Sequence, residues 1–343
     1  MKIALYLSTL GGSPLQVGLF RGLQELGHEV TYFNPGNGYD LVLIFNQTAH
    51  TREYIYPTFP DDSVPIAFVD CAEYGYYKRL PNIIRHYANA FAPGSMSHDT
   101  KDCGEQEKLR RFLQGKSFPY FLREHSKYIE FPSEYHPIDY PLYAFSVCHD
   151  RPDREEYLRR EQDLFVSWGA SHPWRMHITD ALRGCHVKSE IRVLNDQAGE
   201  QVPRMPQDEF FSRTRSAKAS VSFDGYGSGS FRMTEVLVRT LLLQGPLSIR
   251  TRAPLEDGVT SVAYDVESDG EEFLGTDVCQ KLHSALADPE RSFGIYERGY
   301  DHCMTHLTER ATAQYVLDTV AAHDWNRPTG LDLGLFREQD EVG

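Results

Sequence analysis

The chain has 343 residues, of which 41% are hydrophobic and 24% are charged. This balance excludes a disordered protein, and the length exceeds what one ordinary hydrophobic core needs, so we expect two domains. The formal net charge of −14 argues against binding of nucleic acid along the whole surface, because such proteins present a basic face, although it is compatible with a local basic groove.

The first 150 residues predict an α/β domain. Residues 2–7 form an apolar run typical of a buried strand, and an amphipathic helix follows at 15–27, where Gly27 ends it. Strands alternating with helices at this spacing predict a parallel, doubly wound sheet. Residues 103–160 show no clean periodicity and are interpreted as a connector. The further strands predicted in this half are 28–33, 39–45, 64–70 and 88–93.

Residues 151–325 predict a second α/β series, followed by a tail at 326–343. Each half opens with a buried strand, a loop rich in small residues and a helix. The predicted strands are 163–168, 191–194, 218–223 and 246–250, and the predicted helices are 175–184, 205–217, 232–245, 271–288 and 290–322.

The cysteines are scattered and include no C-x-x-C pair, which in a chain of this length predicts reduced thiols in a cytoplasmic protein. The two adjacent Cys-His pairs rarely reach one ion together, so we expect no metal site. No apolar run reaches the roughly 18 residues of a transmembrane helix. The apolar run at the amino terminus is too short and too typical of a strand for a signal peptide. The cysteines are Cys71, Cys103, Cys148, Cys185, Cys279 and Cys303.

The segment SFDGYGSGSFRMTE at 222–235 leads from a predicted strand into a predicted helix. Glycines allow close approach of the backbone, and unpaired N–H groups at a helix start suit a phosphate. Arg232 can add a bidentate contact, and Glu235 can accept a hydrogen bond from a ribose hydroxyl. The alternative is a flexible turn with an ordinary cap, in which Arg232 and Glu235 form a solvated pair.

A second candidate loop follows the predicted strand 163–168. Gly169 and Ser171 lie at the end of that strand, and His172 and Arg175 lie at the start of the next helix. Both loops are expected at the carboxyl ends of strands in one sheet, where Rossmann-like folds bind ligands. His172 is equally compatible with a surface position, and Pro173 with a structural helix start.

Asp70 ends an otherwise apolar strand and is expected at the rim of the first sheet. A carboxylate there, shielded by the tyrosines at 74, 76 and 77, can act as a general base. An ordinary loop cap explains the same residue equally well.

Three segments carry a resemblance to a known family: VSFDGYGSGSFRMTEVL at 221–237, FVSWGASHPWR at 165–175 and FPYFLREH at 118–125. They resemble glycosyltransferases of the GT-B fold, with the closest likeness to the CgeB/YkvP-like proteins and the glycosyl transferases group 1 family. The likeness is specific at 221–237 and only architectural in the first 100 residues. It implies two Rossmann-like domains facing a central cleft, with the acceptor in 1–150 and the donor in 151–325.

The resemblance also implies roles for individual residues. The loop residues Gly227, Ser228, Gly229 and Ser230, with Phe231 and Arg232, would meet the diphosphate of a nucleotide sugar, by default a UDP-sugar. Glu235 would meet the ribose, and Gly169, Ser171, His172 and Arg175 would line the same pocket. Arg232 would stabilise the leaving group, without a metal or a separate cofactor.

One departure from the family pattern leaves the stereochemistry open. Many retaining members carry E-x7-E, whereas the residue eight positions before Glu235 is Gly227. If the mechanism inverts the anomeric centre, Asp70 would deprotonate the acceptor hydroxyl.

The acceptor and the catalytic status have alternatives. A small molecule or a glycan is expected as acceptor, and the basic clusters at 108–111 and 159–160 keep a hydroxymethylated DNA base as a second class. A non-catalytic nucleotide-sugar binding protein would need the same pocket. An oxidoreductase is disfavoured because no dinucleotide fingerprint follows the first strand.

Overall fold

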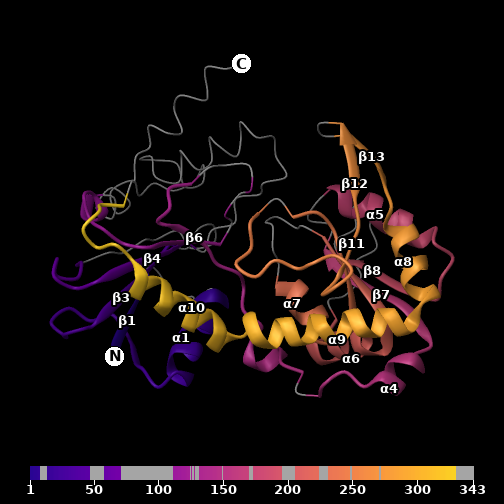
Figure 1. Ribbon diagram of the computed structural model, residues 1–343, viewed down its shortest axis with the longest axis horizontal. Coiled ribbons are helices and arrows are strands. Elements are labelled where there is room, and N and C mark those ends of the chain that lie inside the picture. The colour runs from indigo at the N-terminus through magenta and orange to yellow at the C-terminus, as the bar shows by residue number, and fades with distance from the viewer. Residues whose placement is uncertain are drawn as a thin grey trace. The chain divides into compact units, whose positions relative to one another are not determined.

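The structure is a computed structural model, in which the chain forms two compact units (Figure 1). Unit 1 comprises Met1–Tyr140, Ser248–Arg252 and Glu309–Gly343, and unit 2 comprises Pro141–Leu247 and Ala253–Thr308. Residues 309–325, predicted from the sequence as the end of the second α/β series, thus belong to unit 1. The residues described are 1–7, 14–46, 58–70, 111–123, 125, 127, 131–148, 150–169, 173–194, 205–223, 231–247, 249–269 and 272–329.

Unit 1 is built on a six-stranded sheet with the order β2-β1-β3-β4-β5-β6, in which every neighbouring pair is parallel. The predicted parallel sheet is therefore confirmed. The inner strands β1, β3, β4 and β5 are nearly continuous apolar runs, as expected for strands covered on both faces. The predicted strand 88–93 lies outside the described residues. The strands are β1 (Lys2–Leu7), β2 (Glu29–Tyr32), β3 (Leu41–Asn46), β4 (Ile66–Asp70), β5 (Tyr120–Leu122) and β6 (Tyr135–Pro137).

Helix α1 (Pro14–Glu25) packs against α10 (Glu309–Ala322), although the two are separated by nearly the whole sequence (Figure 1). Leu15, Leu19 and Leu23 lie on one face of α1 and are fully buried, and Gly27 follows the helix with a φ of 83°. Gly22 lies where the helices meet. A Cβ added there would fall on the carbonyl oxygen of Glu309 and 2.9 Å from the Cβ of Ala313.

We therefore expect Gly22→Ala to lower the free energy of unfolding by about 1–3 kcal/mol, because the overlap outweighs the better helix propensity of alanine. Urea denaturation followed by far-ultraviolet circular dichroism measures this. Gly38→Ala is the matched control, since an added Cβ there meets nothing within 4 Å. Equal losses in the two variants would contradict the close helix packing.

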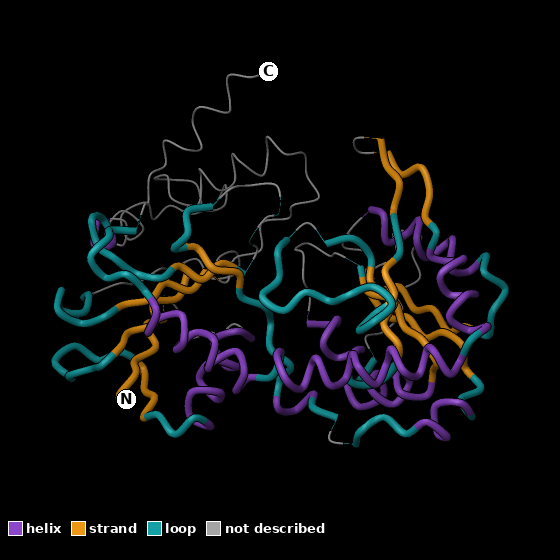
Figure 2. The backbone as a smooth tube through the Cα atoms, viewed as in Figure 1, coloured by secondary structure: helices purple, strands orange, loops and turns teal. Residues whose placement is uncertain are grey.

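Unit 2 is built on a five-stranded parallel sheet with the order β11-β10-β9-β7-β8, and a separate antiparallel hairpin, β12–β13, stands outside it (Figure 2). The strands are β7 (Gln162–Gly169), β8 (Ser189–Leu194), β9 (Ala217–Ser222), β10 (Leu241–Gln244), β11 (Val262–Ala263), β12 (Val266–Asp269) and β13 (Glu272–Thr276). The helices are α4 (Arg154–Leu158), α5 (Pro173–Arg183), α6 (Gln207–Ser216), α7 (Phe231–Leu237), α8 (Val278–Ala287) and α9 (Pro289–His306), with a short 3₁₀ turn, η1, at Ala144–Ser146.

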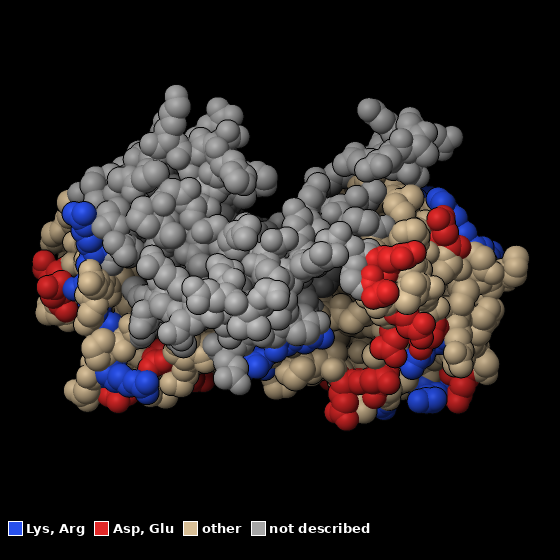
Figure 3. Space-filling view, turned by 90° about the horizontal axis from the view of Figure 1, so that it is seen from above, with Lys and Arg blue, Asp and Glu red and all other residues tan. Residues whose placement is uncertain are grey.

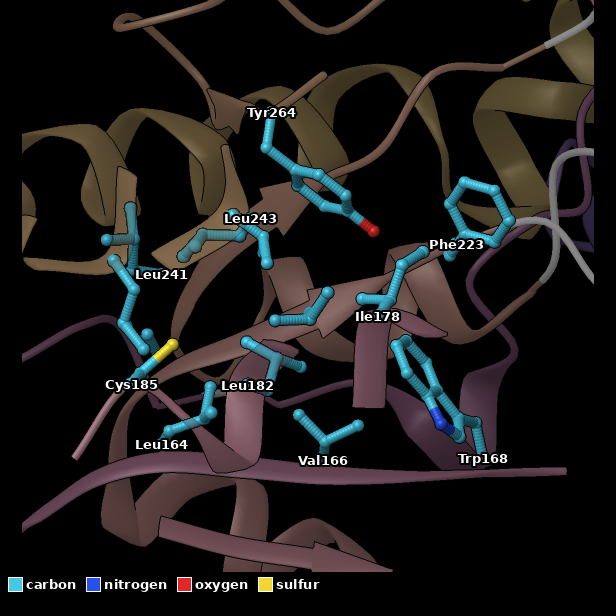
Figure 4. Packing of buried hydrophobic residues seen from close by; sticks show 14 of the residues in the cluster. Leu164, Val166, Trp168, Ile178, Leu182, Cys185, Phe223, Leu241, Leu243 and Tyr264 are labelled. Atoms are coloured by element: carbon cyan, nitrogen blue, oxygen red, sulfur yellow. The ribbon is translucent and has the colours of Figure 1, made fainter. Parts of the chain in front are cut away.

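One core of unit 2 lies on the face of the sheet that α5 and α8 cover (Figure 4). Alternate residues of β7, including Leu164 and Val166, pack there against Ile178 and Leu182 of α5. Phe223 follows β9 on the same face. The opposite face carries the other residues of each strand, as the two-residue period of a strand requires.

Three predicted helices of this half are wrong in extent. The predicted helix 290–322 is the two helices α9 and α10, which belong to different units. The predicted helix 232–245 is helix α7 followed by strand β10, with a turn at 238–240 between them. The predicted helix 271–288 is strand β13 followed by helix α8, and the predicted strand 246–250 is not a strand. A short apolar run such as LLLQ fits a helix and a buried strand equally well, and here parallel pairing with β9 decides.

The expectation of reduced thiols is also wrong in one respect. Cys185 and Cys279 form a disulfide across 94 positions of sequence, joining the residues after α5 to the first turn of α8. The spacing gave no sign of it because the packing of α5 against α8 brings the two residues together. Cys148 and Cys303 are free thiols.

Removing this disulfide should destabilise unit 2, because the cross-link restricts the unfolded chain. We expect Cys279→Ser to lower the free energy of unfolding by about 2–4 kcal/mol. Urea denaturation followed by tryptophan fluorescence measures the loss, and dithiothreitol should reproduce it in the wild type. Cys148→Ser serves as the control, and a wild type insensitive to dithiothreitol would contradict the expectation.

None of the described helices combines the length and the apolar character that crossing a membrane would demand.

Candidate functional site

The carboxyl edge of the unit 2 sheet brings the two predicted loops together. Strands β7 and β9 are parallel neighbours, so Gly169 at the end of β7 and Ser222 at the end of β9 lie at the same edge. Helix α5 begins after the first loop and α7 after the second. The predicted binding residues Ser171, His172, Gly227, Ser228, Gly229 and Ser230 lie outside the described residues, as does the side chain of Phe231.

Arg175 connects the ends of the two strands. Its Nη1 donates to the carbonyl oxygen of Gly169 at 3.0 Å, and its Nη2 donates to that of Phe223 at 2.7 Å. The guanidinium also lies 5.6 Å from the ring of Trp168, and the residue is 9% exposed. Arg175 therefore holds the points from which both loops start.

Glu235 of α7 is a buried carboxylate, 3% exposed. Its Oε1 accepts hydrogen bonds from Ser146 Oγ at 3.4 Å and Gln207 Nε2 at 3.5 Å. Its Oε2 lies 3.8 Å from Arg232 Nη1. Burial raises the pKa of Glu235, and the positive charges of Arg232 and Arg239 offset only part of that effect.

Two arginines flank Glu235, each stacked on an aromatic ring of α6. The guanidinium of Arg232 lies 3.9 Å from the ring centre of Phe210, and that of Arg239 lies 3.6 Å from Phe211. The Arg232 side chain is 29% exposed, whereas Arg239 is buried. Arg232 is therefore the cation of the pair that a ligand can reach.

Arg239 holds the cluster together through backbone carbonyls. It donates to the carbonyl oxygens of Glu235 at 2.8 Å and Ser146 at 2.6 Å. Sequence reasoning missed Arg239, Ser146 and Gln207. The four-residue spacing of Glu235 and Arg239 was the only available signal, because Ser146 and Gln207 reach the site from distant segments.

A row of short polar side chains also lies at this edge. Gln244 and Ser222 are partners in the register of β10 and β9, and the register of β7 and β9, continued by three residues, places Ser167 beside Ser222. All three are more than nine-tenths buried. Within the described parts of the chain, Oε1 of Gln244 has no hydrogen-bond donor. This edge of the sheet therefore has buried polar side chains, including an amide oxygen that can accept a further hydrogen bond.

Asp70 ends β4 in unit 1 and is fully buried. Its Oδ2 accepts a hydrogen bond from the hydroxyl of Tyr120 at 2.9 Å, and its carbonyl oxygen accepts one from the N–H of Arg123 at 3.1 Å. Tyr135 stacks on Tyr120 with ring centres 4.4 Å apart, and burial together with the Asp70 charge raises the pKa of Tyr135. Asp70 lies in a different unit from Glu235, and its action as a base stays a prediction.

Among the residues placed by the structure, no group of three or more His, Cys, Asp or Glu side chains could hold a metal ion.

The raised pKa of Glu235 makes a prediction about stability. The native state keeps this proton at pH values where the unfolded chain, with the ordinary pKa of 4.5, has lost it. The native advantage is complete below 4.5 and declines as pH rises toward the raised native value. Glutamine does not titrate, so the variant Glu235→Gln does not lose this contribution. As pH rises through this window, the free energy of unfolding of the wild type should therefore fall relative to that of Glu235→Gln.

Paired urea denaturation of wild type and Glu235→Gln at a series of pH values tests this. Glu209→Gln, which removes an exposed carboxylate of α6, is the matched control. If the free energy of unfolding of the wild type instead rises relative to that of Glu235→Gln as pH rises, the raised pKa of Glu235 is contradicted.

Comparison with known proteins shows that this chain resembles solved structures in its fold only. No protein-family model and no curated protein matches the chain. Among solved structures, Anabaena Alr3699/HepE in complex with UDP-glucose matches with a TM-score of 0.50 at 10% identity, covering 94% of this chain and 100% of that one. The same protein in complex with UDP gives a TM-score of 0.50 at 11% identity, with the same coverage.

Two further structures match with TM-scores below 0.5. An alpha-glucosyltransferase in complex with UDP-glucose and DNA containing an abasic site matches at 0.46 and 10% identity, covering 94% of this chain and 99% of that one. The UDP-GlcNAc 2-epimerase of Neisseria meningitidis, bound to UDP-GlcNAc, matches at 0.43 and 10% identity, with coverages of 94% and 100%. The fold class predicted from the sequence, two parallel-sheet α/β domains of the GT-B type, is confirmed; the CgeB/YkvP-like family stays a prediction.

Proposed function

We propose that this protein is a glycosyltransferase that moves a sugar from a nucleotide-sugar donor, by default a UDP-sugar, to a hydroxyl acceptor. The observation that carries the proposal is the Arg232–Glu235 pair in α7, at the edge where β7 and β9 end. Ligands of parallel α/β sheets bind at this edge. A protein of the same fold, HepE, has been crystallised with UDP and with UDP-glucose.

The two side chains suit the two polar parts of such a donor. Stacking on Phe210 fixes the plane of the Arg232 guanidinium, and a planar, preoriented guanidinium is suited to bind a diphosphate with two parallel hydrogen bonds. Glu235 is held by Ser146 and Gln207, neighbouring arginines offset part of the effect of burial on its pKa, and its carboxylate can accept hydrogen bonds from ribose hydroxyls. The loop Gly227–Ser230 and Phe231 supply main-chain contacts to the diphosphate in this proposal.

The second loop contributes through Arg175. Because this guanidinium is engaged by the carbonyl groups of Gly169 and Phe223, we assign it the role of holding both loops rather than of a direct diphosphate ligand. Ser171 and His172 remain proposed lining residues of the donor pocket.

The reaction forms a bond from the acceptor oxygen to the anomeric carbon and breaks the bond from that carbon to the diphosphate. The leaving electron pair goes to the diphosphate, whose charge Arg232 stabilises without a metal or a further cofactor. If the anomeric centre inverts, Asp70 takes the acceptor proton, with Tyr120 orienting its carboxylate.

The acceptor is proposed to be a hydroxyl of a small molecule or a glycan rather than of DNA. Acidic side chains gather on the described surface of unit 2 in Figure 3, in line with the net charge of −14, and phosphate backbones avoid such surfaces.

The donor is tested first by thermal stabilisation with a panel of UDP-, GDP- and TDP-sugars. A donor at a hundredfold excess over its Kd stabilises the folded protein by ~2.7 kcal/mol. Release of free sugar from the stabilising donor without acceptor then separates an enzyme from a mere binder, because many glycosyltransferases leak sugar to water. Stabilisation without any release would support the binding protein instead.

The site is tested by Arg232→Ala and Glu235→Gln. Loss of a charge-assisted hydrogen bond costs about 1.5–3 kcal/mol, so each variant should weaken donor binding roughly 10- to 150-fold. Arg213→Ala removes a surface arginine of α6 and is the matched control. Isothermal titration with the stabilising donor measures the effect, and unchanged Kd values in both site variants would overturn the assignment.

A further inference from the structure

A second pocket lies in unit 1, at the opposite edge of its sheet from Asp70. Its volume is about 520 Å³, within the roughly 300–1,000 Å³ range of small-molecule sites. Glu134 lies just before β6, at the amino end of a strand, whereas Asp70 ends the parallel strand β4. The donor and acceptor residues proposed above do not line it. We call it the α10 pocket, lined by Ser133, Glu134, His136, Tyr315, Asp318, Thr319, Ala322, His323, Asp324 and Arg327.

One face of α10 forms a wall of the pocket. Tyr315, Asp318, Thr319 and Ala322 are spaced at i, i+3, i+4 and i+7, which places them along one side of a helix. Asp318 is the exposed carboxylate of this wall, where its Oδ1 accepts a hydrogen bond from Gln314 Nε2 at 2.8 Å.

Glu134 is the buried carboxylate of the pocket, 7% exposed. Its Oε1 lies 3.3 Å from Nε of Arg327, whose side chain is 70% exposed. Its Oε2 is buried, and no described residue donates a hydrogen bond to it. A buried carboxylate oxygen without a donor is costly, so this oxygen, which none of the described residues pairs, is suited to accept a hydrogen bond from a ligand.

The lining as a whole accepts more hydrogen bonds than it donates. Three carboxylates, of Glu134, Asp318 and Asp324, face one guanidinium, that of Arg327. Burial is the largest effect on His136 and on His323 and lowers the pKa of both from 6.5, although the negative charge of Glu134 opposes it, so both rings are mainly neutral at pH 7. Each neutral imidazole keeps one nitrogen as an acceptor, which makes the pocket anionic overall.

From this lining we propose that the α10 pocket binds a small organic cation through its ammonium group. An ammonium offers three N–H donors and a positive charge, which match Glu134 Oε2 and the carboxylate of Asp318. Tyr315 and Ala322 offer apolar contact to the alkyl part. An anion is excluded by the charge of the lining, and a bound metal ion is disfavoured because no described group of three ligating side chains converges there.

Isothermal titration of the full chain with spermidine tests the proposal, with myo-inositol and magnesium chloride as separate titrants. We expect spermidine to bind and its affinity to fall as salt is raised, because the contact is ionic. Absence of spermidine binding, or equal binding of myo-inositol or magnesium, would overturn the proposal.

Variants then place the binding in this pocket. Glu134→Gln and Asp318→Asn should each weaken spermidine binding at least tenfold, while the exposed β13 carboxylate variant Glu272→Gln should leave it unchanged. Circular dichroism confirms folding, and if Glu134→Gln fails to fold, Asp318→Asn on the helix surface decides. Equal binding by Asp318→Asn and Glu272→Gln would overturn the proposal.

The outcome is independent of the glycosyltransferase assignment. Donor affinity should be the same in Asp318→Asn and in the wild type, because the pocket lies at the amino edge of the unit 1 sheet.

Discussion

The two hydrogen bonds of Arg175 are the interaction on which the candidate donor site depends. By donating to the carbonyl oxygens of Gly169 and Phe223, one guanidinium joins the last residue of β7 to the first residue after β9. Parallel strands end at a common edge but leave their last carbonyl groups unpaired, and the arginine satisfies two of them in a buried place. The starts of both loops are thereby fixed relative to α5 and the sheet.

Near this junction, unit 2 buries two charged side chains, Glu235 and Arg239, which are surrounded by hydrogen-bond partners. Glu235 and Arg239 are both almost inaccessible, and the two aromatic rings of α6 cover the guanidinium groups of Arg232 and Arg239. A buried charge is tolerated where hydrogen bonds and an opposite charge surround it. The result is a buried carboxylate beside one accessible cation, Arg232. The accessible charge of the site is therefore positive, which suits the diphosphate proposed as its ligand.

Unit 1 divides its polar chemistry between the two edges of one sheet. Asp70 with Tyr120 occupies the carboxyl edge, and the α10 pocket with Glu134 occupies the amino edge. The second of these exists because α10 returns to unit 1 from the far end of the chain and packs on α1 at Gly22. A single helix thus packs on α1 and forms a wall of a polar pocket.

The sequence by itself determined the two parallel α/β sheets, the end of α1 at Gly27 and the edge shared by the two loops, since these follow from local periodicity and chain order. It also singled out Arg232 and Glu235, because a glycine-rich segment between strand and helix is a local signal. Only the tertiary structure decided that Leu241–Gln244 pairs as a strand, that Cys185 meets Cys279, that Ser146, Gln207 and Arg239 surround Glu235, and that α10 joins unit 1. These features arise from contacts between residues far apart in the chain, where burial and pairing energies override local preference.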